Sequence, residues 1–130
     1  MPINRPLSPH IQIYKPQITS LVSITHRATG IFLFFGALLL SCWLISATYG
    51  PEIFHQTNKV IKSWPGLFIL FGLTASIFFH LANGIRHLYW DFGKGFELSK
   101  VRTGAWIVII FTIIMTATIW IMNFLALGPK

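Results

Sequence analysis

Charge is scarce in this sequence, and acidic charge is the scarcest. Only 10% of the 130 residues are charged, and Asp and Glu together occur three times against ten Lys and Arg. Hydrophobic residues make up 54% of the chain, and its mean hydropathy is +0.66. An average soluble domain has about 25% charged residues and a smaller apolar share. The composition therefore excludes an ordinary soluble domain and indicates a small membrane protein.

Cysteine and catalytic motifs are also nearly missing. The single cysteine, Cys42, excludes an internal disulfide, and because it lies inside an apolar run we expect it to be a small packing residue. The sequence contains no internal repeat, no phosphate-binding glycine loop, no zinc-ligand spacing and no pair of nucleophile and base. We therefore assign no catalytic residue and do not expect the chain to be catalytic alone.

Long apolar stretches are what the sequence has in abundance. Three of them, at about 21–49, 65–90 and 104–127, reach the roughly 20 residues that a helix needs to cross a bilayer. We expect an all-α membrane protein in which residues 20–130 form one three-helix transmembrane anchor domain. Three helices shield few side chains from lipid, so we expect this domain to be part of a heteromeric helix bundle.

The segments between and before these spans are expected to be irregular. Residues 1–19 contain four prolines and predict an extended cytoplasmic N-terminal arm. Ser20 is the expected N-cap of the first helix. Residues 50–63 are expected to form a short polar loop with His55 on its surface, and Asp91 is expected to begin a turn before the third span.

The basic residues flank the spans unequally. With three crossings, the arm and the second loop share one side, which carries most of the basic residues: Arg5, Lys15, Arg27, Arg86, Lys94, Lys100 and Arg102. The other side carries the rest: Lys59, Lys62 and Lys130. The positive-inside rule then places the N-terminus in the cytoplasm, and this orientation explains the net charge of +7 without a nucleic acid partner. The first residues lack the apolar core of a signal peptide, which favours a bacterial inner membrane, with the mitochondrial inner membrane as the alternative.

One stretch places ionisable side chains at the end of the second span. At about 100° per residue, His80, Gly84, His87 and Asp91 fall within about 60° of one another on one helix face. An ionisable residue inside a span costs roughly 2.5–3.5 kcal/mol, so it indicates a functional site. Neutral imidazole is a good haem ligand, and Gly84 leaves room for a flat group or another helix. A histidine that only hydrogen-bonds to a neighbouring helix accounts for the pattern as well.

A second polar stripe lies at the start of the first span. Ser23, His26, Arg27 and Gly30 have i, i+3, i+4, i+7 spacing and share a face. Arg27 could instead extend to lipid headgroups while Ser23 bonds back to its own helix. Both stripes belong to the same leaflet, so we expect them to meet at one shared pocket. A channel or transporter would instead need polar residues at several depths.

Three motifs occur in order, RPLSPH over 5–10, SITHRATG over 23–30 and HLANGIRHLYWDFG over 80–93. Together they resemble the cytochrome b membrane-anchor subunits of succinate dehydrogenase, and the resemblance covers essentially the whole chain. It implies a subunit of respiratory complex II that helps transfer electrons from iron-sulfur centres to ubiquinone. A haem-free structural anchor of a related quinone oxidoreductase, such as fumarate reductase, is the alternative.

The resemblance also implies roles for individual residues. His80 would be one axial ligand of a haem b, with the other ligand on a second, smaller anchor subunit. Ser23 and Arg27 would line a ubiquinone site beside the iron-sulfur subunit, and a flavoprotein subunit would complete the assembly. His26 and Arg27 would lie near the haem propionates, with His87 in the same region. A hydroxyl can bond a quinone carbonyl, and a guanidinium suits anionic oxygens, which agrees with these roles.

Overall fold

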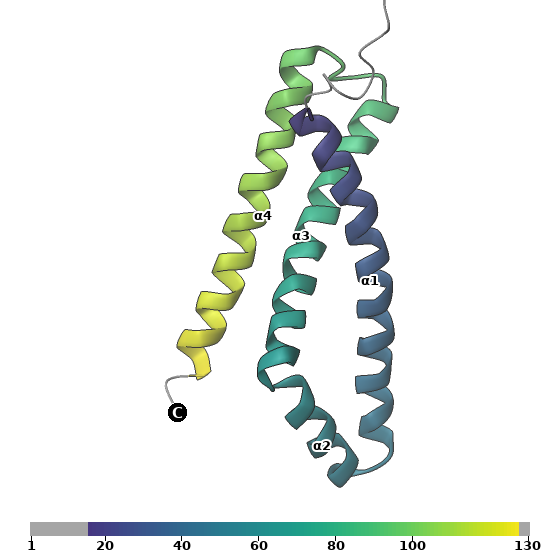
Figure 1. Cartoon of the computed structure of the whole chain (residues 1–130), viewed down its shortest axis with the longest axis vertical. Coiled ribbons are helices and arrows are strands. Elements are labelled where there is room, and N and C mark those ends of the chain that lie inside the picture. Colours follow the sequence, from purple (N-terminus) through teal and green to yellow (C-terminus); the bar gives the residue numbers. More distant parts are fainter. Residues whose placement is uncertain (1–15, 128–130) are drawn as a thin grey trace, which may run out of the picture.

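The structure is a computed structural model that describes residues 16–127, so most of the arm expected over 1–19 lies outside the described residues. Within 16–127 the chain forms no strand and four helices: α1 (Ile18–Thr48), α2 (Pro51–Ile61), α3 (Trp64–Asp91) and α4 (Leu98–Leu127). The helices α1, α3 and α4 are long and apolar enough to cross a membrane. This confirms the expected all-α architecture with three spans. Figure 1 shows that the start of α1, the end of α3 and the start of α4 meet at one end of the molecule.

Helix α1 begins earlier than expected. The backbone N–H groups of Ser20 and Leu21 donate to the carbonyl of Gln17 at 3.0 and 3.1 Å, so Gln17 occupies the N-cap position. The prediction of Ser20 as N-cap was wrong. Ile18 packs against the buried core, and this contact favours a helix that starts two residues before the capping residue that the sequence offered.

The expected polar loop over 50–63 was also wrong, because most of it is the helix α2. Pro51 stands at its start, where its missing N–H costs nothing. The indole N–H of Trp43 in α1 donates to Asn58 Oδ1 at 3.1 Å, and the rings of Trp43 and Phe54 lie 5.6 Å apart. These contacts attach α2 to the end of α1. His55, on another face of α2, is exposed as expected.

The turn between α3 and α4 is where the sequence places it, but α4 begins at Leu98 and thus before the apolar stretch. Gly93 and Gly95 have φ values of 72° and 80°, a conformation that glycine adopts at little cost. Glu97 lies 2.8 Å from Lys100 Nζ, and the hydrogen bond from Lys100 lowers the pKa of the Glu97 carboxyl. Hydropathy marks where lipid contact begins, whereas the helix itself starts about two turns earlier.

The buried core is small and lies at the end where α1, α3 and α4 meet. Its hydrophobic members are Val22, Phe79, Ala105 and Val108. Most other large apolar side chains of the three long helices are exposed. Cys42 is exposed too, so its expected packing role is not fulfilled by the described part of this chain. The described chain thus presents apolar surface that lipid or other helices must cover.

Candidate functional site

Three histidines from the two polar stripes lie side by side. The rings of His26 in α1 and His80 in α3 are stacked, with centroids 4.0 Å apart and planes 13° apart. His87, about two turns further along α3, lies 5.1 Å from His26. The expected meeting of the two stripes is therefore observed. The stacked rings leave no room for a flat group between them, so this contact is packed and is not a pocket.

His80 is held through one ring nitrogen by α1. Its Nδ1 lies 3.2 Å from Thr29 Oγ1 and 3.2 Å from the backbone carbonyl oxygen of His26. The Thr29 hydroxyl in turn donates to the same carbonyl at 2.9 Å. The other ring nitrogen of His80, Nε2, is the one left for a ligand.

Gly30 permits the close approach of the His80 ring to α1. A Cβ atom at Gly30 would lie 3.1 Å from His80 Cε1, tighter than ordinary contact. A Cβ at Gly84 would lie 3.9 Å from His26 Cε1, which is ordinary van der Waals distance. The role of Gly30 as the clearance for His80, and that of Thr29 as its partner, were missed. Their signal was present, since Thr29 and Gly30 lie three and four residues after His26.

His26 carries an unusual buried atom. Its Nδ1 is buried and makes no hydrogen bond in the described chain. Buried polar atoms nearly always have a partner, so this nitrogen marks a place where a polar group from outside residues 16–127 can bind. Ser23 is half-buried and Arg27 is exposed. Within residues 16–127 neither side chain forms a hydrogen bond or ion pair. Asp91 is exposed at the end of α3 and takes no part in the cluster.

Arg86 has a structural position that the sequence did not reveal. It is only 8% exposed, although its charge was counted with the residues that flank the membrane. Its guanidinium donates to Asn83 Oδ1 at 3.1 Å and to the carbonyl of Val101 in α4 at 3.2 Å. It also lies 4.1 Å from the ring centroid of Trp90. Arg86 therefore links α3 to the start of α4.

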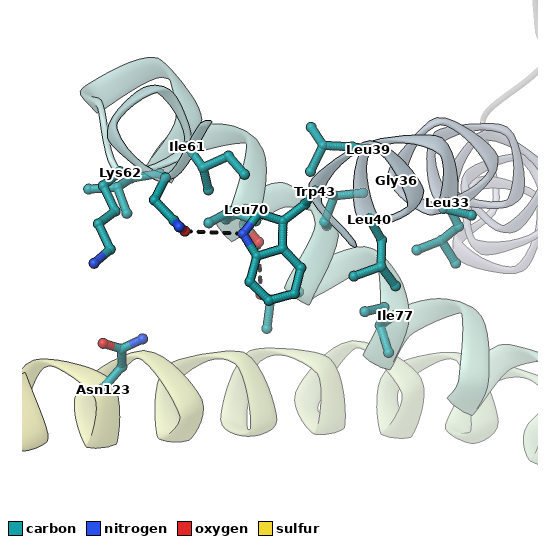
Figure 2. A pocket seen from close by; sticks show the side chains of 15 residues that line it. Leu33, Gly36, Leu39, Leu40, Trp43, Ile61, Lys62, Leu70, Ile77 and Asn123 are labelled. Atoms are coloured by element: carbon teal, nitrogen blue, oxygen red, sulfur yellow. Dashed lines mark hydrogen bonds between the residues drawn. The ribbon is translucent and has the colours of Figure 1, made fainter. Parts of the chain in front are cut away.

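An apolar groove of about 650 Å³ lies towards the opposite end, where α2 meets the long helices (Figure 2). Figure 2 shows Trp43 bonded to α2 in its wall, with Lys62 and Asn123 near its rim. None of the site residues expected from the sequence lines this groove. It is a feature separate from the histidine cluster.

The histidine cluster fits a haem better than a bare metal ion. Among residues 16–127 no group of three or more His, Cys, Asp or Glu side chains is arranged to hold a metal ion. A metal at His80 would thus need its other ligands from outside the chain, as a porphyrin and a partner's side chain provide. A neutral imidazole with one nitrogen hydrogen-bonded and the other available is the arrangement that iron requires. The donor set of the chain fits the group.

The sequence matches, over residues 1–119, the family described as succinate dehydrogenase/fumarate reductase transmembrane subunit. The chain belongs to this family. It is similar to the succinate dehydrogenase cytochrome b556 subunit of Rickettsia felis, with 41% identity over 117 residues that cover 90% of this chain and 91% of the relative. The corresponding subunit of Paracoccus denitrificans is 35% identical over 121 residues, 93% of each chain.

A mitochondrial relative is similar as well. The succinate dehydrogenase cytochrome b560 subunit of Sus scrofa is 39% identical over 116 residues, covering 85% of this chain and 67% of the relative. The family membership confirms the resemblance that the three motifs indicated. Together with the three apolar helices, it makes the chain a multi-pass transmembrane subunit of the complex II type.

Proposed function

We propose that this chain is the haem b-binding membrane anchor of a succinate:ubiquinone oxidoreductase and that it contributes to the quinone site. The observation that carries the proposal is the position of His80. Its Nδ1 lies against two oxygen atoms of α1, which leaves Nε2 for iron. The names of the relatives, all cytochrome b subunits of succinate dehydrogenase, support the same cofactor.

His80 would hold the haem iron, and a smaller anchor subunit would supply the other protein ligand. Haem b supplies a one-electron carrier near the quinone. His26 would offer its unpartnered Nδ1, and Arg27 its charge, to the haem propionates. The His87 ring lies 5.1 Å from that of His26, and His87 would stand in the same propionate region.

The quinone site is assigned to Ser23 and Arg27. Both lie in the first turns of α1, Ser23 about one turn before His26 and Arg27 directly after it, and neither is tied to another side chain in the described part of the molecule. The Ser23 hydroxyl can donate to a quinone carbonyl, and the Arg27 guanidinium stabilises negative charge on a reduced quinone oxygen. A proton for the reduced quinone would come from water at this end of α1.

The partners follow from the same assignment. We propose a second small anchor subunit beside the haem, an iron-sulfur subunit at the end of the molecule where α1 begins, and a flavoprotein subunit beyond it. The excess of basic residues at this end favours a cytoplasmic location in a bacterial inner membrane. Within residues 16–127, Arg27, Lys94, Lys100 and Arg102 lie there, whereas Lys59 and Lys62 lie at the other end.

The haem assignment is tested by His80→Ala in the co-expressed complex, with His55→Ala as control because His55 is exposed on α2, far from the cluster. The expected result is loss of the b-type band in the reduced-minus-oxidised spectrum of the His80 variant alone. An unchanged band would remove His80 as a ligand. Absence of any haem absorbance in the wild-type complex would favour the haem-free structural anchor.

The quinone assignment is tested by Arg27→Ala, with Arg102→Ala as a control that removes an exposed arginine from α4 at the same end. We expect succinate:ubiquinone reductase activity to fall by about tenfold or more in the first variant, as for the loss of a hydrogen bond to a charged group. Reduction of an artificial acceptor at the iron-sulfur centres should be retained. Full ubiquinone reductase activity of Arg27→Ala would contradict the assignment.

A further inference from the structure

Two oxygen atoms of α1 converge on a single nitrogen of His80. The Thr29 hydroxyl oxygen and the His26 carbonyl oxygen each lie 3.2 Å from Nδ1. They come from one turn of α1, because the Thr29 hydroxyl also donates to that carbonyl at 2.9 Å. The three atoms form a closed triangle that couples the side chain of α3 to the backbone of α1.

The protons in this triangle can be assigned from donor and acceptor chemistry. A backbone carbonyl only accepts, so the contact between the His26 oxygen and Nδ1 needs a proton on Nδ1. The single hydroxyl proton of Thr29 is directed to the His26 carbonyl, so the Thr29 oxygen also meets Nδ1 as an acceptor. If Nδ1 were unprotonated, its lone pair would face the carbonyl lone pairs at 3.2 Å. His80 therefore has its proton on Nδ1 and, when neutral, a free lone pair on Nε2.

We infer that Thr29, together with the His26 carbonyl, is a positioning element that fixes the tautomer and ring orientation of His80 and so tunes the group bound at Nε2. This inference rests on the proposed haem ligation by His80. A hydrogen bond from Nδ1–H to an acceptor raises the electron density at Nε2 and favours ferric over ferrous iron. Removal of one acceptor should therefore shift the haem midpoint potential to a more positive value.

Gly30 gives the arrangement its close fit. A Cβ at this position would approach His80 Cε1 to 3.1 Å, so a larger residue would push the ring away from both oxygen atoms. The ring is also stacked on His26 at 4.0 Å, which restrains its rotation. The His80 ring is thus restrained on one face by the His26 ring. Along its Nδ1–Cε1 edge it is restrained by the His26 carbonyl, Thr29 and Gly30.

The experiment is a redox titration of the b-type absorbance in the purified complex carrying Thr29→Val, which keeps the shape and removes the hydroxyl. At the wild-type midpoint potential, the ferric-to-ferrous ratio of this variant is expected to fall several-fold. Thr29→Ser restores a hydroxyl and should return the ratio close to the wild-type value. The matched control is Thr74→Val, since Thr74 is a half-buried threonine of α3 that bonds only to the carbonyl of Leu70.

A second variant covers the case in which Thr29→Val does not assemble. Thr29→Ala removes the same hydroxyl with a better helix former and must shift the ratio in the same direction. Wild-type haem content and potential in the hydroxyl-free variant would overturn the inference while leaving the haem assignment in place. Loss of the proposed function itself has a different signature, an unchanged b-type band in His80→Ala.

Discussion

At the scale of single residues, the chemistry depends on which atoms of α1 face His80. His26 contributes a ring face and a backbone carbonyl, Thr29 contributes a hydroxyl oxygen, and Gly30 contributes the absence of a side chain. None of these contributions is itself a ligand. They determine how one imidazole is oriented and which of its nitrogens is protonated.

The clearance at Gly30 gives a prediction of its own. Gly30→Ala should displace the His80 ring by a few tenths of an ångström and lower haem affinity about tenfold. This is the lower end of the loss in affinity usually seen when a residue that orients a metal ligand is changed. The measurement is the haem-to-protein ratio of the purified complex during competition with a haem-binding apoprotein.

Gly72→Ala provides the matched control for this prediction. It adds the same methyl group at the contact of α1 and α3, where a Cβ would lie 3.3 Å from Phe32 Cε1, the far end of a side chain that can move. Equal haem retention in the Gly30 and Gly72 variants would contradict the role given to Gly30.

The sequence predicted the residues of the site better than their contacts. Regular helix spacing was enough to place His80 and His87 on one side of α3, because 3.6 residues per turn fixes which side chains share a face. It could not show that Thr29 rather than Ser23 reaches His80, because that depends on how α1 crosses α3. For the same reason, the sequence did not show that Gly30, rather than Gly84, lies against the His80 ring.

At the scale of helices, Arg86 connects α3 to the first turns of α4. Its charged hydrogen bonds to Asn83 and Val101 are nearly shielded from solvent, and Arg86 is in contact with the Trp90 ring. A Cβ at Gly104 would lie 3.3 Å from Arg86 Nε, so α4 also comes close to this side chain. The junction of the three long helices therefore contains a polar link beside its small apolar core.

Arg86→Met should remove this link while keeping much of the side-chain volume. We expect a loss of about 1.5–3 kcal/mol in the free energy of unfolding, the usual range for hydrogen bonds made by a charged group. The loss is measured by denaturant titration of the purified complex in detergent. Arg102→Met, an exposed position on α4, should change stability by less than about 0.5 kcal/mol. Similar stabilities for the two variants would show that Arg86 is not a structural link.

Helix α2 is an element that hydropathy did not predict. Its composition is polar enough to resemble a loop, and none of its residues is buried. What makes it a helix is local chemistry, with Pro51 at its start, Glu52 in its first turn and Lys59 in its last turn. The bond from Trp43 to Asn58 then fixes it against α1. The three spans, by contrast, were predictable because length and apolar content alone identify them.

At the scale of the whole molecule, the two ends differ in charge and in chemistry. The end where α1 begins carries the histidine cluster and most of the described basic residues, and the end with α2 carries the apolar groove. Figure 1 shows these ends separated by the length of the helices. An uneven distribution of this kind predicts a single orientation in the membrane.

The orientation can be measured with single cysteines in a Cys42→Ser background. Lys94→Cys in the turn after α3 and Lys59→Cys on α2 are both exposed and lie at opposite ends of the chain. A membrane-impermeant thiol reagent added to intact cells should label the Lys59 variant and label the Lys94 variant only after lysis. The reverse pattern would show that the N-terminal end faces outward and would contradict the proposed cytoplasmic quinone site.

The most direct test of the account is chemical rescue at position 80. In the co-expressed complex, His80→Gly should lose its b-type band and regain it when free imidazole is added, because imidazole can occupy the space of the missing side chain and supply the nitrogen ligand. Retention of the full b-type band by His80→Gly without imidazole would contradict the account, since the iron would then be held by a ligand other than His80.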